Sequence, residues 1–445
     1  MFKDTTLTPV DQVHKVIGKY MLADGFEIIF DTKNSYRNKL VDARNGDKYI
    51  DFFTFFASSP LGINHPKLDS KEVKEILGEV AVNKPSNSDI YTKYMADFVA
   101  TFGRIAKPDY MKYLFFISGG ALAVENGLKV AFDWKVQKNF QKGIKEEKGY
   151  QVLHFKEAFH GRSGYTLSLT NTDPVKIKYF PKFNWPRVTN PKVTFPLNDH
   201  LDEIIELEKN AINEIKTAIK NNPDDIAVII IEPIQGEGGD NFFRKDFFEE
   251  LRAIADENDI LLMFDEVQTG FGLTGKMWAA DHYVKPDIIS FGKKAQVCGI
   301  MVSGRVDEVN NNCFHVSSRI NSTWGGNLVD MVRSNFIMQI IKEENLVENA
   351  AERGNYLLGR LEEIQVQHPE LISNVRGLGL MCSFDLPDEG LRDQFRKMSY
   401  EKKLLILGCG EKSIRFRPSL NITDNELEEG LQIIEKVLKL MLSKN

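Results

Sequence analysis

The sequence predicts an α/β protein with a mostly parallel β-sheet and a smaller α+β domain. Residues 226–231 form a continuous apolar run, which is typical of a strand buried on both faces of a parallel sheet. Residues 245–258 then show helical spacing of their apolar side chains, and a second apolar run begins at Ile260. This alternation of strand, helix and strand favours parallel pairing.

Three zones follow one another along the 445 residues. Residues 1–80 contain short segments of alternating polarity, such as 26–30 and 48–53, and a turn-rich loop at 62–66. Residues 81–330 carry the alternating strands and helices, and we expect them to form the large domain. Residues 331–445 contain long helical stretches with short strands between them, which predicts the smaller domain.

Composition excludes several classes of function. The net charge of −6, with 42% hydrophobic and 27% charged residues, is that of an ordinary soluble protein and gives no basic surface for nucleic acid or anionic membrane. No apolar run reaches membrane-spanning length, and residues 1–6 lack the apolar core of a signal peptide. The four cysteines show no C-x-x-C spacing, so neither a disulfide framework nor a metal site is indicated. We expect a cytoplasmic protein.

Two residues at predicted strand ends carry the strongest chemical signal. The apolar residues 261–264 lead into Asp265, and Lys293 follows 28 residues later, after a second apolar strand at 287–291. Ligands of open α/β sheets bind outside the carboxyl ends of the strands, so both side chains are expected in one crevice. A buried carboxylate near a lysine is what a pyridoxal phosphate (PLP) site requires, because the lysine forms a Schiff base and the carboxylate keeps the pyridine nitrogen protonated.

Two other interpretations compete for this pair. An apolar strand that ends in Asp265 and Glu266 is also typical of the magnesium-binding strand of an NTPase, but that class needs a G-x-x-x-x-G-K-[ST] loop, which the sequence lacks. Alternatively, the aspartate caps a helix and the pair Lys293 and Lys294 is simply solvated.

Further motifs lie where the same crevice would form. A glycine-containing turn at 118–126 follows an apolar strand and opens a helix, whose free N–H groups suit an anion. After the next strand, Phe159 offers an aromatic face to a flat cofactor and Arg162 a bidentate contact to a carboxylate. Polar and acidic groups also gather in the glycine-rich loop 232–239.

These motifs together resemble the class III, PLP-dependent aminotransferases of fold type I. The resemblance runs from residue 51 to the segment 415–418 in the family's order, and its most specific parts are 264–270 and the Lys293 segment. It implies a seven-stranded, mostly parallel sheet in a PLP-binding domain at 81–330. It also implies that residues 1–80 contribute to the small domain and the substrate site, with 331–445 as the C-terminal small domain.

The resemblance also implies roles for single residues. Lys293 aligns with the Schiff-base lysine, with Lys294 as its rival, and the enzyme would be a homodimer with shared active sites. The implied cofactor contacts are Asp265 at the pyridinium nitrogen, Gln268 at the phenolic oxygen, Phe159 and Val267 on the two ring faces, the backbone amides of Gly120 and Ala121 at the phosphate, and Thr323 of the partner subunit at the same phosphate.

Within the class, several stretches are similar to the lysine-specific subgroup, among them 52–59, 292–299 and 321–327. Most members follow the lysine with a small residue and two glycines, whereas this chain has Lys-Ala-Gln-Val-Cys at 294–298. The implied reaction moves the side-chain amine of L-lysine to 2-oxoglutarate. Its products are L-glutamate and 2-aminoadipate 6-semialdehyde, which cyclises to piperideine-6-carboxylate.

Four substrate contacts are implied by the same resemblance. Arg415 would bind the α-carboxylate of glutamate, and Glu237 would neutralise Arg415 when lysine is present. Arg162 would hold the remote carboxylate, and Asn321 would lie beside the substrate. Two alternatives remain at this point: another ω-aminotransferase, acting on ornithine or 4-aminobutyrate, or a PLP-binding protein without turnover. The intact set of Asp265, Gln268 and Lys293 argues against the second.

Overall fold

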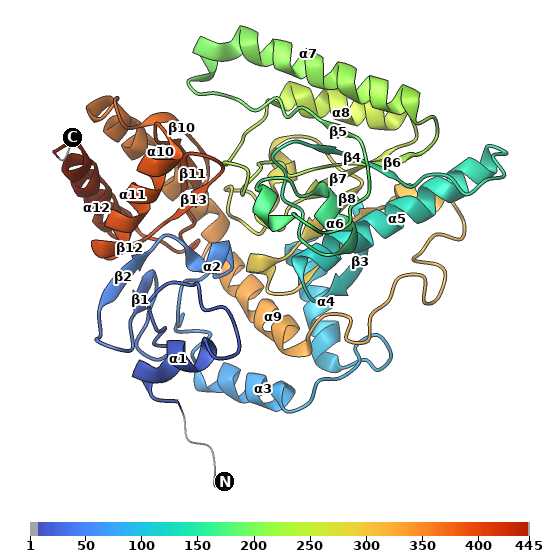
Figure 1. Cartoon of the computed structure of the whole chain (residues 1–445). Coiled ribbons are helices and arrows are strands. Elements are labelled where there is room, and N and C mark those ends of the chain that lie inside the picture. Colours follow the sequence, from blue (N-terminus) through green and yellow to red (C-terminus); the bar gives the residue numbers. More distant parts are fainter. Residues whose placement is uncertain (1–7, 444–445) are drawn as a thin grey trace.

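A seven-stranded sheet forms the centre of the molecule (Figure 1). The computed structural model describes residues 8–443, so the segment 1–6 discussed above lies outside the described residues. The strand order is β3-β9-β8-β7-β6-β4-β5, and β9 runs antiparallel to the other six strands, which confirms the mostly parallel sheet. The strands are β3 (Met111–Ile117), β4 (Gln151–Phe155), β5 (Arg187–Val188), β6 (Ile226–Ile231), β7 (Leu261–Asp265), β8 (Ile288–Phe291) and β9 (Cys298–Ser303).

Helices cover both faces of this sheet, which explains why its central strands β6, β7 and β8 are buried along their whole length. Side chains alternate along β6, so Val228 and Ile230 pack with helix α5 (Gly120–Gln141) on one face. Ile229 and Ile231 belong to the cluster on the other face, which includes α8 (Lys245–Glu257). All six residues of β6 are buried, as the sequence predicted.

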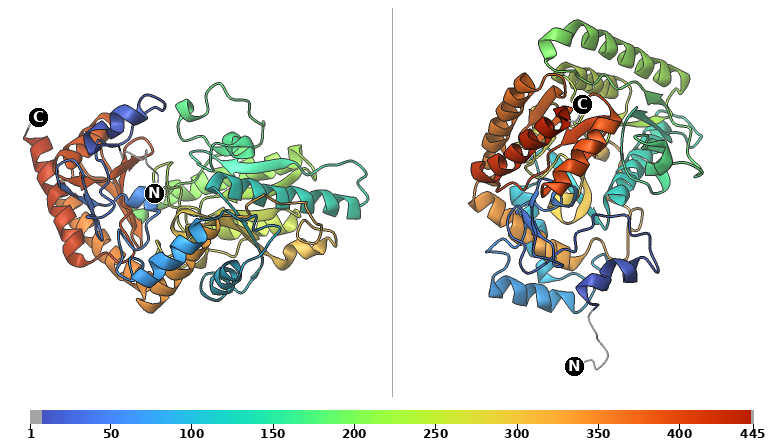
Figure 2. Two further views of the ribbon diagram at one scale, coloured as in Figure 1. Left: turned by 90° about the horizontal axis from the view of Figure 1, so that it is seen from below. Right: turned by 60° about the vertical axis from the view of Figure 1, so that its left-hand side comes forward.

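Two smaller sheets accompany the large one, and the first of them joins the beginning of the chain to its end. One has the order β1-β2-β12 and the other β10-β11-β14-β13. Because β12 pairs in parallel with β2, the N-terminal segment lies beside the C-terminal helices (Figure 2). The strands are β1 (Lys39–Val41), β2 (Lys48–Asp51), β10 (Ser373–Leu378), β11 (Met381–Asp385), β12 (Leu404–Leu405), β13 (Leu407–Cys409) and β14 (Ser413–Arg415).

The remaining helices complete the layers around the three sheets. They are α1 (Val13–Ile17), α2 (Thr54–Ala57), α3 (Lys71–Ala81), α4 (Lys93–Ile105), α6 (Gly164–Leu169), α7 (Leu197–Asn221), α9 (Leu328–Glu343), α10 (Leu346–Gln367), α11 (Glu389–Glu401) and α12 (Asp424–Leu442). Short 3-10 turns are η1 (Val10–Gln12), η2 (Pro174–Lys176), η3 (Ala279–His282), η4 (Lys293–Ala295) and η5 (Gly304–Glu308). No helix within residues 8–443 is long and apolar enough to cross a membrane.

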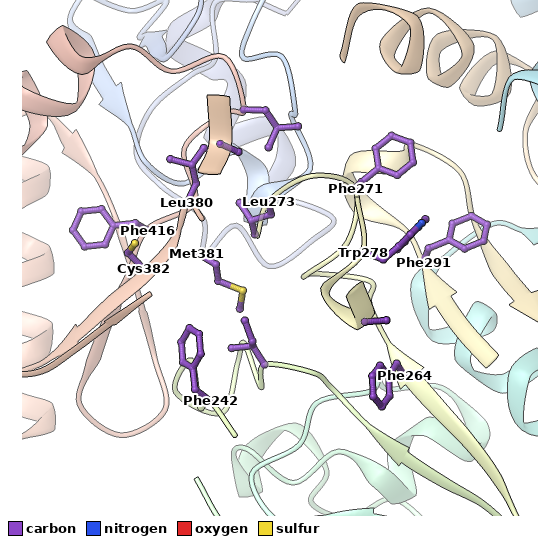
Figure 3. Packing of buried hydrophobic residues seen from close by; sticks show 14 of the residues in the cluster. Phe242, Phe264, Phe271, Leu273, Trp278, Phe291, Leu380, Met381, Cys382 and Phe416 are labelled. Atoms are coloured by element: carbon purple, nitrogen blue, oxygen red, sulfur yellow. The ribbon is translucent and has the colours of Figure 1, made fainter. Parts of the chain in front are cut away.

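The loop after β7 attaches the large sheet to the C-terminal one. Leu380 donates its backbone N–H to the carbonyl oxygen of Leu273 at 2.9 Å, and Figure 3 shows both side chains near Met381. Gly379 adopts a φ of +56° at this turn, where an added Cβ would lie 2.4 Å from the backbone of Thr274. A side chain is therefore excluded there, and β11 and β14 are held close to the end of β7.

Candidate active site

A cavity of about 570 Å³ opens at the carboxyl ends of the central parallel strands, a size suited to a small organic ligand. Each of three adjacent strands delivers a charged residue to it: Glu232 follows β6, Asp265 ends β7, and Lys293 follows β8. The lining residues are Ser58, Gly120, Ala121, Phe159, His160, Gly161, Glu232, Glu237, Asp265, Val267, Gln268, Lys293, Gln296, Cys298, Asp330 and Arg333.

Asp265 is held rigidly at the base of the cavity. Its Oδ1 accepts hydrogen bonds from Ser290 Oγ at 3.1 Å and from the backbone N–H of Val267 at 3.2 Å. Its Oδ2 lies 2.8 Å from Nδ1 of the buried His160. A carboxylate can only accept, so this contact assigns the Nδ1 proton to the imidazole. Nothing in the sequence indicated this role for His160, although the residue directly follows Phe159.

The two adjacent lysines point in different directions. Lys293 lines the cavity, whereas Lys294 is buried and donates its Nζ to the backbone carbonyl of Gln268 at 3.2 Å. Burial, together with the nearby positive charges of Arg415 and Arg417, lowers the pKa of Lys293 to about 8. A lowered pKa leaves a substantial neutral fraction near neutral pH, which an amine nucleophile requires.

The turn into α5 forms one wall of the cavity. Gly119 adopts a φ of +107°, and the helix begins at Gly120. A Cβ on Gly120 would lie 3.0 Å from Val267 Cγ1, so a side chain here would crowd the site. The free N–H groups of this long helix therefore face the cavity without an obstructing side chain, which suits an anionic group.

A buried ion pair orients the amide of Gln268. Arg417 donates Nε and Nη2 to Gln268 Oε1 at 3.0 and 2.8 Å. The guanidinium is itself paired with Asp240, and both side chains are almost completely buried. Because Oε1 is occupied by Arg417, the Nε2 group of Gln268 remains available as a donor toward the cavity. Arg417 lies in the segment 415–418, which contributes to the family resemblance, but its contact with Gln268 was not predicted.

Glu232 fixes the loop that carries Phe159. Its two carboxyl oxygens accept the backbone N–H groups of Phe159 at 2.9 Å and Gly236 at 3.1 Å. Burial raises the pKa of Glu232 to about 7, while the neighbouring His160 works in the opposite direction. Strand β6 therefore supplies the anchor that places the aromatic ring at the cavity wall.

Glu237 and Arg415 form an ion pair between the large sheet and β14. Arg415 Nη2 donates to Glu237 Oε2 at 2.8 Å, and the arginine side chain is only 3% exposed. Burial works to raise the pKa of Glu237, but Arg415 and Lys176 together lower it below its ordinary value. The carboxylate is therefore ionised near neutral pH and compensates the charge of Arg415.

Four residues expected at the site do not line the cavity in the single chain. Arg415 lines a neighbouring cavity and is linked to the site by its ion pair with Glu237, and the other three lie elsewhere. Arg162, Asn321 and Thr323 are exposed and do not line the cavity. The loop that contains Thr323 is held by Ser86, whose Oγ donates to the Thr323 carbonyl at 2.6 Å.

Several cavity-lining residues were missed by the sequence analysis, and Asp330 and Arg333 illustrate why. They form an ion pair of 2.7 Å on α9, and nothing in the local pattern separates them from an ordinary solvated helix face. Ser58, Gln296 and Cys298 lie in the stretches 52–59 and 292–299, which are similar to the lysine-specific subgroup, but the similarity implied no role for any of the three.

The family of the chain follows from comparison with known proteins. A model of the aminotransferase class-III family matches residues 24–438. The chain belongs to the class III aminotransferases. Its central sheet is that of the predicted fold type I.

Among relatives of this class III aminotransferase are several L-lysine-epsilon aminotransferases. The one from Mycobacterium tuberculosis is 48% identical over 97% of this chain and 96% of its own length. The one from Streptomyces clavuligerus is 45% identical over 97% and 95%. Human mitochondrial 4-aminobutyrate aminotransferase is 32% identical over 94% of this chain and 86% of its own. A solved structure of lysine aminotransferase from M. tuberculosis in the internal aldimine form superposes with a TM-score of 0.96, covering 97% of this chain and all of that one.

Class III aminotransferases use PLP, and the residues of this cavity fit that cofactor. Lys293 lies in the cavity with a lowered pKa, as covalent attachment of an aldehyde requires. Asp265 is oriented by three hydrogen-bonding groups, as a partner of a pyridinium nitrogen should be. The start of α5 presents N–H groups to a phosphate beside a glycine whose Cβ would crowd Val267.

Proposed function

We propose that this class III aminotransferase transfers the 6-amino group of L-lysine to 2-oxoglutarate. The observation that carries the proposal is the ion pair that Glu237, a residue of the cavity wall, forms with Arg415, which lines an adjoining cavity. An aminotransferase that uses both lysine and glutamate must accept an uncharged chain and a carboxylate at the same position. An arginine paired with a glutamate can serve both, because the pair is neutral with lysine and the freed arginine binds a carboxylate. Relatives that are 45–48% identical and named L-lysine-epsilon aminotransferases support the same substrate.

The cofactor, when bound, supplies an electron sink for the carbon that carries the amine. Lys293 would hold it covalently and, once released, move a proton at the reacting carbon. Asp265 would keep the ring nitrogen protonated, while Gln268 would donate to the phenolic oxygen. Phe159 and Val267 would enclose the ring, and the amides of Gly120 and Ala121 would bind the phosphate.

The charge of Glu237 would select between the two substrates. With lysine in the site, Glu237 stays on Arg415, and the wall near the reacting carbon is neutral. With glutamate or 2-oxoglutarate, Glu237 moves aside and Arg415 binds the α-carboxylate as a charge-assisted, bidentate pair. Arg162 would bind the remote carboxylate and Asn321 would contact the substrate; both need a change of side-chain position or a second chain, since neither lines the cavity here.

Incubation of the PLP-loaded protein with L-lysine and 2-oxoglutarate tests this function directly. The expected products are L-glutamate and 2-aminoadipate 6-semialdehyde, trapped after cyclisation to piperideine-6-carboxylate. Parallel reactions with ornithine and 4-aminobutyrate serve as the substrate panel. Faster turnover of either of these than of lysine would overturn the lysine assignment while leaving the enzyme class intact.

We also propose that the enzyme is a cytoplasmic homodimer with shared active sites, in which Thr323 contacts the phosphate in the partner's site. Thr323→Ala should then weaken PLP retention by about tenfold to a hundredfold, because a hydroxyl donating to a phosphate contributes about 1.5–3 kcal/mol. Equilibrium dialysis against PLP measures the change, and Thr323→Ser, which keeps the hydroxyl, should stay near wild type. An unchanged PLP affinity in Thr323→Ala would remove this residue from the site.

Mixed dimers distinguish contact across the interface from contact within one chain. A Lys293→Ala chain is combined with a Thr323→Ala chain, and activity is measured at limiting PLP. If Thr323 acts across the interface, one site of the hybrid collects both changes while the other is intact. The hybrid should then recover up to half of wild-type activity with wild-type PLP affinity. Weak PLP affinity throughout would show that Thr323 serves its own chain.

A further inference from the structure

Glu237 contacts a second cation besides Arg415. Lys176 Nζ lies 2.6 Å from Glu237 Oε1, while Arg415 Nη2 lies 2.8 Å from Glu237 Oε2. The carboxylate therefore bridges two positive charges, one on each oxygen. The side chain of Arg415 is 3% exposed and that of Lys176 24%, so the bridge runs from the interior toward solvent.

Lys176 is held in place by local structure. It ends the 3-10 turn η2, whose first residues are capped by Asp173 through a hydrogen bond of 2.9 Å from the Val175 N–H. Its ammonium also lies 5.6 Å from the centre of the Phe159 ring, within reach of a cation–π attraction. The lysine is thus positioned beside the ring proposed to stack on the cofactor.

Glu237 separates the active-site cavity from a second, outer cavity of about 630 Å³. Lys176 and Arg415 both line the outer cavity. The other lysine of its lining, Lys192, pairs with Glu157 at 2.7 Å. Arg392 donates to the carbonyl oxygens of Gly410 and Glu411, both at 2.7 Å. Among the described residues, Lys176 and Arg415 are the cations bonded to Glu237.

This arrangement determines what happens when a carboxylate takes Arg415. The substrate can bind the guanidinium only if the hydrogen bond between Arg415 and Glu237 Oε2 breaks. The freed Glu237 is partly buried, and such a carboxylate without a cation is strongly unfavourable. Lys176 already holds the other oxygen, so the glutamate can turn away from Arg415 and keep a counter-charge. Loss of Lys176 would therefore tie Glu237 more firmly to Arg415.

We propose that Lys176 is a positioning residue that receives Glu237 when a dicarboxylate occupies Arg415. This inference rests on the proposed function, since it extends the Glu237 switch to a second cation. Lys176 would favour the 2-oxoglutarate and glutamate half-reaction and contribute little to the lysine half-reaction.

Lys176→Met, which keeps the length of the side chain and removes its charge, tests the proposal in the PLP-loaded enzyme. Calorimetric titration with glutarate, an unreactive five-carbon dicarboxylate, should show affinity reduced by about tenfold, the equivalent of about 1.4 kcal/mol. Single-turnover rates should fall by a similar factor with glutamate and change by less than about twofold with lysine, because Glu237 still neutralises Arg415.

Three variants give the controls. Lys176→Arg should restore glutarate affinity, since it returns the positive charge. Lys192→Met removes a lysine from the same outer cavity and should leave both half-reactions unchanged. In a Glu237→Gln background, Lys176→Met should lose most of its effect on glutarate, because no carboxylate remains to be received.

The outcomes separate failure of this inference from failure of the proposed function. If wild type turns over lysine but Lys176→Met binds glutarate normally, or loses both half-reactions equally, the role of Lys176 is refuted. If wild type does not use lysine but Lys176→Met still weakens glutarate through Glu237, the substrate proposal fails and the role of Lys176 stands.

Discussion

Lys293→Ala should abolish transamination, with a loss of at least about 10⁴-fold, because this side chain would provide both covalent attachment and proton transfer. The variant should still bind PLP noncovalently, since the proposed contacts of Asp265 and of the start of α5 are untouched. Borohydride reduction of the wild-type enzyme followed by peptide mapping should place the reduced cofactor on Lys293.

Lys294→Met is the matched control for this result. Lys294 donates to the backbone of Gln268 and does not line the cavity, so the variant should retain the reducible linkage and much of its activity. A variant at Lys294 that lost the linkage while Lys293→Ala kept it would shift the assignment by one residue.

Glu237→Ala should slow the lysine half-reaction by about two orders of magnitude relative to the glutamate half-reaction. The substitution leaves Arg415 buried without its carboxylate, and an uncompensated charge of this kind costs several kcal/mol at most. Since about 1.4 kcal/mol corresponds to a tenfold change in rate, this cost accounts for the expected two orders of magnitude. Carboxylate ligands relieve that cost and lysine does not. Stopped-flow measurement of the cofactor absorbance with each amino acid alone gives the two rates.

Glu237→Gln separates charge from shape in this experiment. It keeps the size of the side chain and should reproduce most of the shift in preference. Equal losses with lysine and glutamate in both variants would reduce Glu237 to a structural partner of Arg415. The expected shift is opposite in direction to that of Lys176→Met, so the two positions together test the same switch from both sides.

The sequence was sufficient to predict the central sheet and the chemistry at its edge. Strands β6, β7 and β8 are short, fully buried and mostly apolar segments separated by helices or turns, and such segments leave a strong local pattern. Asp265 and Ser290 are register partners in parallel strands, so Lys293 necessarily follows at the same edge of the sheet. Topology therefore places the acid and the lysine in one cavity, as the sequence predicted.

Alternating polarity predicted the short N-terminal strands less reliably than continuous apolar runs predicted the central ones. Residues 26–30 alternate in polarity as 48–53 do, yet only Lys48–Asp51 forms a strand, while Phe30 contributes a single bridge to Asp42. Alternation allows strand formation, but the partner's backbone decides whether it occurs. The three-zone division of the chain stays a prediction, as do the proposed contacts of Asn321 and Thr323, which do not line the cavity in the single chain.

The sequence by itself determined the fold, the crevice at the strand ends and the residue types that suit PLP, because these follow from local periodicity and parallel topology. Only the tertiary structure decided which of the two lysines faces the cavity, that His160 holds Asp265, and that Glu237 is shared between Arg415 and Lys176. The family resemblance had implied the pair of Glu237 and Arg415, but not Lys176. Lys176 and Glu237 are 61 residues apart, and side chains so distant meet through packing that leaves no periodic trace in the chain.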